Sequence, residues 1–327
     1  HGPRDRRLLL RSLNPFRYGR AALSLQLPYG AHAFLGRGPY DIVHCQFGDL
    51  GLRCMHLRDL GISTAKLVTS FRGYDISHYI RQYGPHVYAE LAVRGDFFLS
   101  NCEYFKRRLL SLGFDPRKVV VLPSGIQCAR FRFAPRQPPA DGRVRVVTTG
   151  RLVEKKGVEY GIRAVARLRA AGVPVEYAVV GDGPLRPHLE QLIGELGLAD
   201  AVTILGWRQE SEVTAVLDRA HLFLSPNVTA ANGDEDAPVN VIKEAMATGL
   251  PVVGTRHGGI PEVVQDGVSG FLAAERDVDD LAARLGHLVA HPELWPSMGQ
   301  AGRAWVERHY DAPMLAARLE EIYRQLL

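Results

Sequence analysis

The fold is decided by the stretch Val144-Arg-Val-Val-Thr-Thr-Gly150-Arg-Leu-Val-Glu-Lys-Lys-Gly157, which joins a β-branched run to a glycine turn and a group of cations. Apolar residues then recur at helical spacing, which predicts a helix across 157–171. A strand, a turn and a helix in this order are the repeating unit of a parallel sheet covered by helices. Because such sheets bind ligands at the carboxyl ends of their strands, this turn is a candidate ligand loop.

The same alternation extends in both directions from this stretch. Strands are predicted near 41–44, 66–70, 96–100, 118–122, 176–180, 202–205, 222–224, 252–254 and 270–272. Helices are predicted near 49–60, 78–93, 103–112, 210–219, 239–248, 278–290 and 312–326. The predicted fold class is therefore α/β, with two doubly wound Rossmann-like domains.

The length of 327 residues fits two domains of about 150 residues each. We predict a first domain over 1–135, a proline- and glycine-rich linker over 136–142, a second domain over 143–310 and a C-terminal helix over 311–327 that packs back on the first domain. The first strand comes late, the chain starts without Met, and its arginine-rich start has no apolar core behind it. We therefore expect the first domain to lack an N-terminal segment.

The composition, with 46% hydrophobic and 23% charged residues, is typical of a soluble globular protein and excludes a disordered, collagen-like or membrane-spanning chain. No apolar run approaches the roughly 18 residues of a transmembrane helix, and no signal peptide is visible. The four cysteines never approach a C-x-x-C spacing, which argues against a structural zinc and a thiol redox pair. We expect reduced thiols and a cytoplasmic location.

Charge is divided unevenly along the chain. Residues 1–142 hold 21 Lys+Arg and 10 Asp+Glu, a charge of +11, while residues 143–327 hold 19 and 25, a charge of −6. The basic half suits peripheral contact with an anionic membrane, and the alternative is a solvated arginine-rich surface. Because this half lacks aromatic residues interleaved with the basic ones, nucleic acid is not an expected partner.

A second candidate loop contains two carboxylates around the start of a predicted helix. Asp236 lies in the acidic run that begins at Asp234, and Glu244 lies eight residues later, within the helix. At 1.5 Å per residue their separation is roughly 10 Å, which is too long for a retaining glycosidase pair and suits two ends of one polyhydroxyl ligand. Three alternatives stay open: Asp234-x-Asp236 as a metal pair, Asp236 as a helix cap and Glu244 as a surface residue.

A double glycine marks the third candidate loop. Gly258 and Gly259 follow a buried strand and precede a helix near Ile260, so the main-chain N–H groups of this turn can bind an anion. The three candidate loops all follow parallel strands. We therefore expect them to face the same edge of the sheet.

Taken in order, the motifs of the second half resemble those of a known family. They are G-R-L-x-x-x-K-G from Gly150, V-V-G-D-G-P from Val179, L-G-W from Leu205, D-x7-E-A-M-A-x-G-L-P-V-V-G-T from Asp236 and G-G-I-P-E-V-V-x-D-G-x-x-G-F-L from Gly258. This series resembles the nucleotide-sugar domain of the retaining family 4 glycosyltransferases, which have the GT-B fold. Segments 41–48, 70–75, 100–101 and 121–125 fall where that family has the loops of its acceptor domain. The family's opening strand and glycine-rich loop are not seen.

The resemblance implies a donor site. Arg151 and Lys156, beside Gly150, would hold the diphosphate, Glu244 the ribose, and Asp236 the sugar hydroxyls. The neighbouring main chain would assist, at Ala237, Pro238, Val239, Gly258, Gly259 and Ile260, and Gly206 would border the base. The first acid of the family's E-x7-E pair is here the shorter Asp236.

The resemblance also implies an acceptor side with His44, Gly73, Asp75 and Ser100. Here the sequence departs from the family pattern, because Arg72 stands where a histidine usually precedes Gly-x-Asp. Either Arg72 supplies a cation in place of the histidine's hydrogen bonds, or the chain belongs to a subgroup of the family that works otherwise. The predicted catalytic set is Arg151, Lys156, Asp236 and Arg72, with no metal.

The activity implied is transfer of a hexose from a nucleoside-diphosphate sugar to a hydroxyl of a glycan or lipid-linked glycan, with retained configuration, in the synthesis of cell-surface polysaccharide or glycolipid. The family's front-face route needs no metal, and the nucleotide sugar is a substrate and not a cofactor. The alternatives are an epimerase or phosphorylase of the same fold and a non-catalytic sugar-nucleotide-binding module. A dehydrogenase is disfavoured, because Gly181-Asp-Gly183 lacks the third glycine of a dinucleotide-binding turn.

Overall fold

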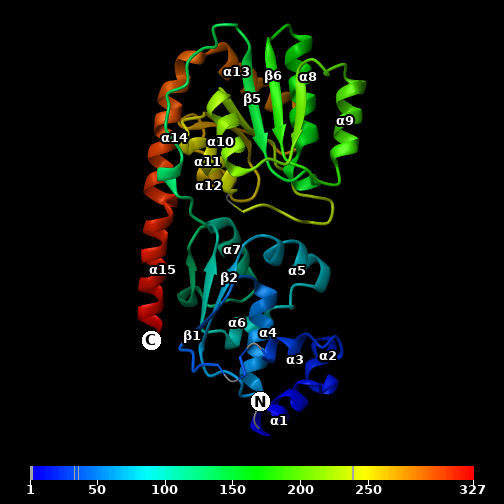
Figure 1. Cartoon of the computed structure of the whole chain (residues 1–327), viewed down its shortest axis with the longest axis vertical. Helices are drawn as coiled ribbons and strands as arrows, with labels where there is room; N and C mark the ends of the chain where they lie inside the picture. Colours follow the sequence, from blue (N-terminus) through cyan, green and yellow to red (C-terminus); the bar gives the residue numbers. More distant parts are fainter. Residues whose placement is uncertain (1–2, 33, 36, 238) are drawn as a thin grey trace. The chain divides into compact units, whose positions relative to one another are not determined.

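The computed structural model describes residues 3–32, 34–35, 37–237 and 239–327. The chain folds as two compact units (Figure 1): a first unit of His1–Leu122 with Ala317–Leu327, and a second unit of Pro123–Ala316. Each contains a parallel β-sheet with helices, so the predicted α/β class with two doubly wound domains is confirmed. The predicted linker 136–142 belongs to the second unit, where the buried Arg136 hydrogen-bonds to two main-chain carbonyl oxygens.

The sheet of the first unit has the order β1-β2-β3-β4 and is parallel throughout. Its strands are β1 (Ile42–Cys45), β2 (Lys66–Phe71), β3 (Phe97–Ser100) and β4 (Val119–Val121), and its helices include α4 (Gly48–Asp59), α5 (His78–Tyr83), α6 (Ala89–Arg94) and α7 (Glu103–Ser111). Val68 and Leu99 pack against Ile322 of the last helix, α15 (Ala312–Leu326). The single helix predicted over 78–93 is wrong, because Gly84 adopts a φ of 90° and ends α5.

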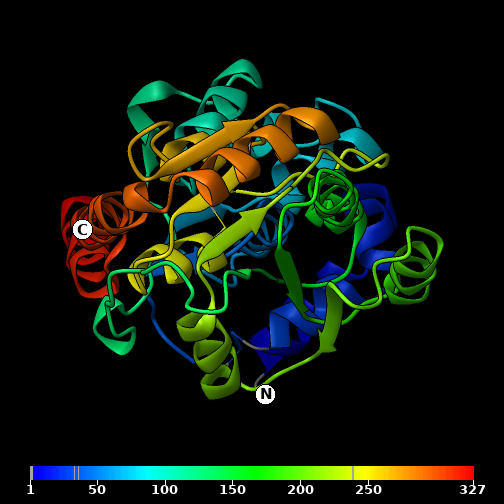
Figure 2. The same cartoon turned by 90° about the horizontal axis from the view of Figure 1, so that it is seen from above.

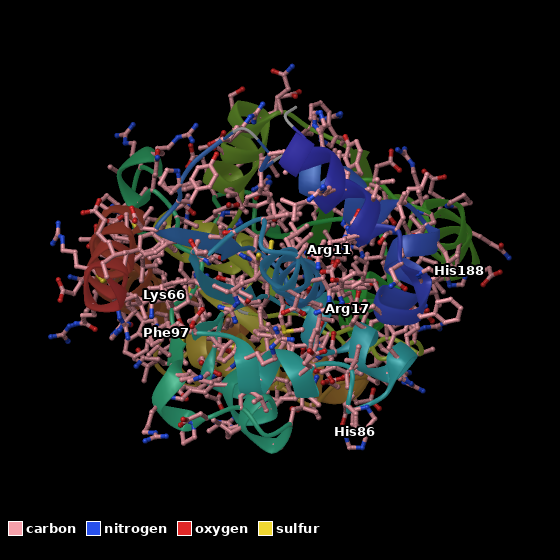
Figure 3. The ribbon with its side chains drawn as sticks, turned by 90° about the horizontal axis from the view of Figure 1, so that it is seen from below. Arg11, Arg17, Lys66, His86, Phe97 and His188 are labelled. Carbon is pink, nitrogen blue, oxygen red and sulfur yellow. The ribbon has the colours of Figure 1, made fainter. Side chains whose placement is uncertain are left out.

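Three helices precede β1: α1 (Pro3–Ser12), α2 (Pro15–Leu23) and α3 (Gln26–His32). The expectation that the arginine-rich start has no apolar core is wrong, since Tyr18, Leu27 and Ala31 are buried against Leu57 of α4. The apolar residues are spaced for one face of each helix, and the described Arg11 and Arg17 are exposed. Figure 3 shows Arg11 and Arg17 on these helices, and Lys66 and Phe97 where β2 and β3 begin.

The sheet of the second unit is parallel and has the order β10-β9-β8-β5-β6-β7. Its strands are β5 (Val144–Thr149), β6 (Val175–Val180), β7 (Val202–Gly206), β8 (Leu222–Ser225), β9 (Val252–Thr255) and β10 (Gly270–Ala273). One core cluster joins the sheet to α8 (Val158–Ala170), α9 (Arg186–Glu195) and α13 (Val278–Ala290), and the other joins it to α10 (Glu210–Arg219), α11 (Asn240–Ala247), α12 (Ile260–Val263) and α14 (Trp295–Tyr310). Figure 2 shows α13 (orange) and α8 (green) on one side of the strands and α10 (yellow-green) on the other. Among the described residues, no helix has both the length and the apolar content to cross a membrane.

Candidate functional site

The candidate donor site lies where the loops after β5, β8 and β9 meet. β5 lies between β8 and β6. The strands β6 and β7 are added on one side of β5, and β8, β9 and β10 on the other, so the carboxyl end of β5 is the switch point of the sheet. Two glycines with positive φ let these loops touch. A Cβ on Gly157 would lie 1.8 Å from the carbonyl oxygen of Pro226, and one on Gly258 would lie 2.2 Å from that of Asp236. The cationic, acidic and double-glycine loops are therefore in contact.

Three ion pairs join the cationic loop to the acidic loop. Lys156 Nζ lies 2.8 Å from Asp236 Oδ2, and Lys155 Nζ lies 3.3 Å from Asp236 Oδ1 and 2.9 Å from Asp234 Oδ2. Asn227, which follows β8, donates to Asp236 Oδ2 at 2.6 Å. Burial alone would raise the pKa of Asp236, but Lys156 and Lys155 outweigh it and lower the pKa. The site thus holds an ionised carboxylate, only 8% exposed, against two ammonium groups.

Two other predicted charged residues are less constrained. The side chain of Arg151 is exposed and makes no hydrogen bond or ion pair with the part of the chain that the structure describes. Glu244 lies half-buried in α11, where burial and the nearby Glu210 raise its pKa. Within residues 3–32, 34–35, 37–237 and 239–327, nothing hydrogen-bonds to the Glu244 carboxylate. Both side chains are therefore open to a ligand.

The predicted main-chain contacts fall in two places. Around Asp236, the N–H of Gly259 lies 3.5 Å from the Asp236 carbonyl oxygen. Ala237, Val239 and Ile260 lie beside these residues in the chain, and Pro238 lies outside the described residues. Gly150 follows β5 and donates its main-chain N–H to Val180 at 2.9 Å, and Gly206 is the last residue of β7 and accepts from Gly181 at 2.9 Å. Glycines thus bring the main chain of β5, β6 and β7 together at this edge.

Sequence reasoning missed Lys155, Asn227, His257 and Glu275. His257 is fully buried, accepts the main-chain N–H of Asp236 on Nε2 at 3.0 Å, and bonds through Nδ1 to Glu275 at 2.8 Å. A signal existed for Lys155, beside Lys156, and for His257, a polar residue between a buried strand and the double glycine. No local pattern marks Asn227, which bonds to Asp236 within the same loop, or Glu275, whose contacts with His257 and Thr229 join distant segments.

Asp234 and Asp236, considered from the sequence as a metal pair, are held by the ammonium groups of Lys155 and Lys156. No cluster of three or more His, Cys, Asp or Glu among the described residues could hold a metal ion. Two fixed positive charges beside these carboxylates would repel a divalent cation. The arrangement favours an anionic ligand.

In the first unit, the predicted acceptor-side residues lie at the carboxyl ends of the strands. Asp75 is fully buried, and its carboxylate accepts the main-chain N–H groups of Gly48 at 2.8 Å, Arg72 at 3.0 Å and Gly73 at 3.0 Å. Burial nevertheless raises the pKa of Asp75. Ser100 is buried too and donates its hydroxyl to a main-chain carbonyl at 2.8 Å. Asp75 therefore ties together the loops after β1 and β2.

His44 and Arg72 lie near one another at the same edge. His44 Nε2 lies 2.7 Å from Ser70 Oγ, and His44 Nδ1 lies 2.5 Å from Tyr323 Oη of α15. Burial, with a smaller effect of Arg72, lowers the pKa of His44 to about 4, so its imidazole is neutral at pH 7. The Arg72 guanidinium donates to Gln46 Oε1. The first unit thus presents one cation beside a neutral histidine.

Comparisons with known proteins agree with this geometry. The family model "Glycosyl transferases group 1" matches residues 143–291, and "Glycosyltransferase Family 4" matches residues 2–130. The chain is 37% identical over 278 residues to the putative colanic acid biosynthesis glycosyltransferase WcaL of Salmonella typhimurium, covering 84% of this chain and 68% of WcaL. It is 34% identical over 324 residues to the amylovoran biosynthesis glycosyltransferase AmsK of Erwinia amylovora, covering 97% of this chain and 78% of AmsK. Its fold matches that of Anabaena Alr3699/HepE in complex with UDP-glucose, with a TM-score of 0.76, 20% identity, and coverage of 93% and 82%.

Proposed function

This chain belongs to glycosyltransferase family 4 and is a glycosyltransferase of GT-B fold, and from this premise we propose that it transfers a hexose from a nucleoside diphosphate to a glycan hydroxyl with retained configuration. The cluster of Lys155, Lys156 and Asp236 at the switch point carries the donor half of this proposal. The relatives WcaL and AmsK, named for colanic acid and amylovoran biosynthesis, support a role in making cell-surface polysaccharide.

The donor diphosphate would bind Lys156 and Arg151 beside Gly150. Its oxygens would compete with Asp236 for the Lys156 ammonium, which frees carboxylate oxygens of Asp236 to accept hydroxyls of the sugar. As the bond from the anomeric carbon to the leaving oxygen breaks, negative charge grows on the diphosphate, and cations already in place stabilise it. Glu244 would accept the ribose hydroxyls, and Gly206 would border the base.

Retention follows in this proposal from a front-face route. The bond to the leaving phosphate oxygen breaks, the acceptor oxygen bonds to the anomeric carbon on the same face, and the acceptor proton passes to the leaving phosphate. Asp236 is an unsuitable nucleophile for the alternative double displacement, because Lys155 and Asn227 still hold its oxygens when Lys156 binds the diphosphate. A diphosphate that accepts the proton needs no other base.

The acceptor would be a glycan or lipid-linked glycan held by the first unit, with Arg72 as the cation at its binding edge. The positive charge of residues 1–142 supports peripheral contact with anionic lipid, where a lipid-linked acceptor would lie. Relatives named as glycosyltransferases do not favour an epimerase, a phosphorylase or a non-catalytic module.

The first test is a thermal-shift screen of UDP-glucose, UDP-galactose, UDP-glucuronic acid and GDP-mannose, because a donor that binds only the native state raises the melting temperature. Turnover of the selected donor with a glycan acceptor is then followed by NMR, which reads the anomeric configuration of the product. Inverted product contradicts retention. Sugar 1-phosphate formed with inorganic phosphate indicates a phosphorylase, an isomerised sugar nucleotide an epimerase, and binding without turnover a non-catalytic module.

A further inference from the structure

His257 and Glu275 form a hydrogen-bonded pair behind the candidate donor site, in which His257 is buried and Glu275 is half-buried. His257 has no exposed surface, follows β9 and lies next to the double glycine. Its Nε2 lies 3.0 Å from the main-chain nitrogen of Asp236, and its Nδ1 lies 2.8 Å from Glu275 Oε1. Since it cannot reach solvent, His257 does not touch a bound sugar.

The hydrogen bonds fix the state of the histidine. A main-chain N–H can only donate, so Nε2 must be the acceptor and Nδ1 carries the proton that is donated to Glu275. His257 is therefore neutral in this arrangement, and Glu275 sets its tautomer. Burial alone would raise the pKa of Glu275, but the hydrogen bonds from His257 and from the main-chain N–H of Thr229 outweigh it and lower the pKa.

The pair holds both ends of the segment 229–236, which contains the acidic residues Asp234 and Asp236. Glu275 Oε2 accepts the main-chain N–H of Thr229 at 2.7 Å, and His257 accepts that of Asp236 seven residues later. At the Asp236 end, the carboxylate is fixed by Lys156, and the carbonyl oxygen packs on Gly258. With its N–H bound as well, Asp236 is restrained through its side chain and its main chain.

We propose that His257 and Glu275 are positioning residues for sugar transfer, holding Asp236 in register with the transferring sugar of the donor. This inference rests on the proposed function, in which Asp236 meets the sugar hydroxyls. A buried histidine is costly to desolvate, and so in part is the half-buried carboxylate of Glu275, whereas an apolar side chain could fill the volume of His257. The pair contributes orientation of Asp236, because displacing a reacting group by about 1 Å can lower a rate about 100-fold.

Four variants separate positioning from structural support. In His257→Leu nothing accepts the Asp236 N–H, whereas in His257→Gln the amide oxygen can still accept it. Glu275→Gln has a single carbonyl oxygen for two donors, His257 and Thr229. His291→Leu is the control, because His291 also bonds to a glutamate through Nδ1, to Glu293 at 2.9 Å, but on an exposed turn away from the sheet edge.

The readouts are calorimetric Kd values for UDP and GDP alone and for UDP-glucose, UDP-galactose and GDP-mannose, together with donor kcat/KM. We expect His257→Leu to bind the bare nucleotide within about twofold of wild type, to lose the extra affinity due to the sugar, and to lower kcat/KM about 100-fold. Glu275→Gln should lower kcat/KM about tenfold, His257→Gln should recover at least about tenfold of the loss, and His291→Leu should match wild type.

Equal weakening of bare nucleotide and nucleotide sugar in His257→Leu, without recovery in His257→Gln, assigns the pair to structural support and overturns the inference. Wild-type affinity for the sugar in all variants overturns it as well and leaves the proposed function standing. If His257→Leu does not fold, His257→Gln and Glu275→Gln give the same comparison. Wild-type protein that binds none of these nucleotides overturns the proposed function and the inference with it.

Discussion

Asp75 in the first unit and Asp236 in the second are both buried aspartates that follow a parallel strand, yet their surroundings differ. Asp236 is paired with two lysines, which lower its pKa, whereas Asp75 accepts three main-chain N–H groups and has a raised pKa. Main-chain dipoles hold a carboxylate in place without neutralising its charge, and ammonium groups do both. Asp75 therefore suits the joining of loops, and Asp236 suits a site where charge is exchanged with a ligand.

Stability should reveal the role of Asp75 most strongly. In Asp75→Ala, three main-chain N–H groups lose their acceptor, and we expect the first unit to lose about 3–5 kcal/mol of unfolding free energy. Urea unfolding with hydrogen exchange of the amides after β1 and β2 measures this loss. Asp115→Ala is the control, because Asp115 caps an exposed turn, and it should change little. Equal stability of the two variants would mean that Asp75 does not tie the loops together.

Removing a lysine should make Asp236 more like Asp75. In Lys156→Ala, Asp236 keeps its burial but loses its closest cation, so its pKa should rise, and kcat should fall about 100- to 1000-fold because the leaving diphosphate loses a charge that stabilises it. Arg151→Ala removes a second cation that is proposed to face the diphosphate, but one whose side chain has no ion-pair partner among the described residues. It should therefore lower kcat and leave the melting temperature unchanged. Steady-state kinetics with the selected donor separates kcat from KM. Unchanged kcat in both variants would place the diphosphate elsewhere.

The loops that meet at the candidate donor site could be predicted from the sequence, because each loop carries its own local signal. A β-branched run, a glycine turn and a helical repeat defined β5, the cationic loop and α8, and the D-x7-E spacing marked Asp236 and Glu244. Parallel strands then bring such loops to one edge whatever the details of packing. The contact of Lys156 with Asp236 agrees with that reasoning.

The rest depends on contacts between segments far apart in the sequence. Glu275 bonds to Thr229 across 46 residues and His44 to Tyr323 across 279, so no local spacing reveals them. The motif of Asp75 resembles a ligand loop, and the sequence did not reveal that its carboxylate accepts three main-chain N–H groups; its place on the acceptor side stays a prediction. The helices α1 to α3 and α14 were missed because arginine, glycine and proline obscured the apolar spacing.

Asp236→Asn tests whether charge or shape matters at the second aspartate. The amide keeps the size of the side chain but cannot balance two lysines, and we expect kcat/KM to fall about 100-fold with only about 1–2 kcal/mol lost in stability. Because the folded-state pKa of Asp236 is lowered, its contribution to stability is present above the unfolded-state pKa and is lost as pH falls through the folded-state pKa. The difference in unfolding free energy between wild type and variant should therefore shrink as the solution is acidified. A pH-independent difference would contradict a role of charge.

Glu244 shares one property with each aspartate and should show the smallest effect. Its pKa is raised, as is that of Asp75, and its carboxylate is open to a ligand, as the proposal requires of Asp236. Accepting ribose hydroxyls needs the ionised form, so donor KM should rise as pH falls through the raised pKa of Glu244. Glu244→Gln should raise donor KM about tenfold at pH 7 with kcat nearly unchanged, since the ribose gains no charge during the reaction. It should also remove that pH dependence, which profiles of kcat/KM between about pH 5 and 8 would measure. If Glu244→Gln lowered kcat and left KM unchanged, Glu244 would act on the reacting sugar and not on the ribose.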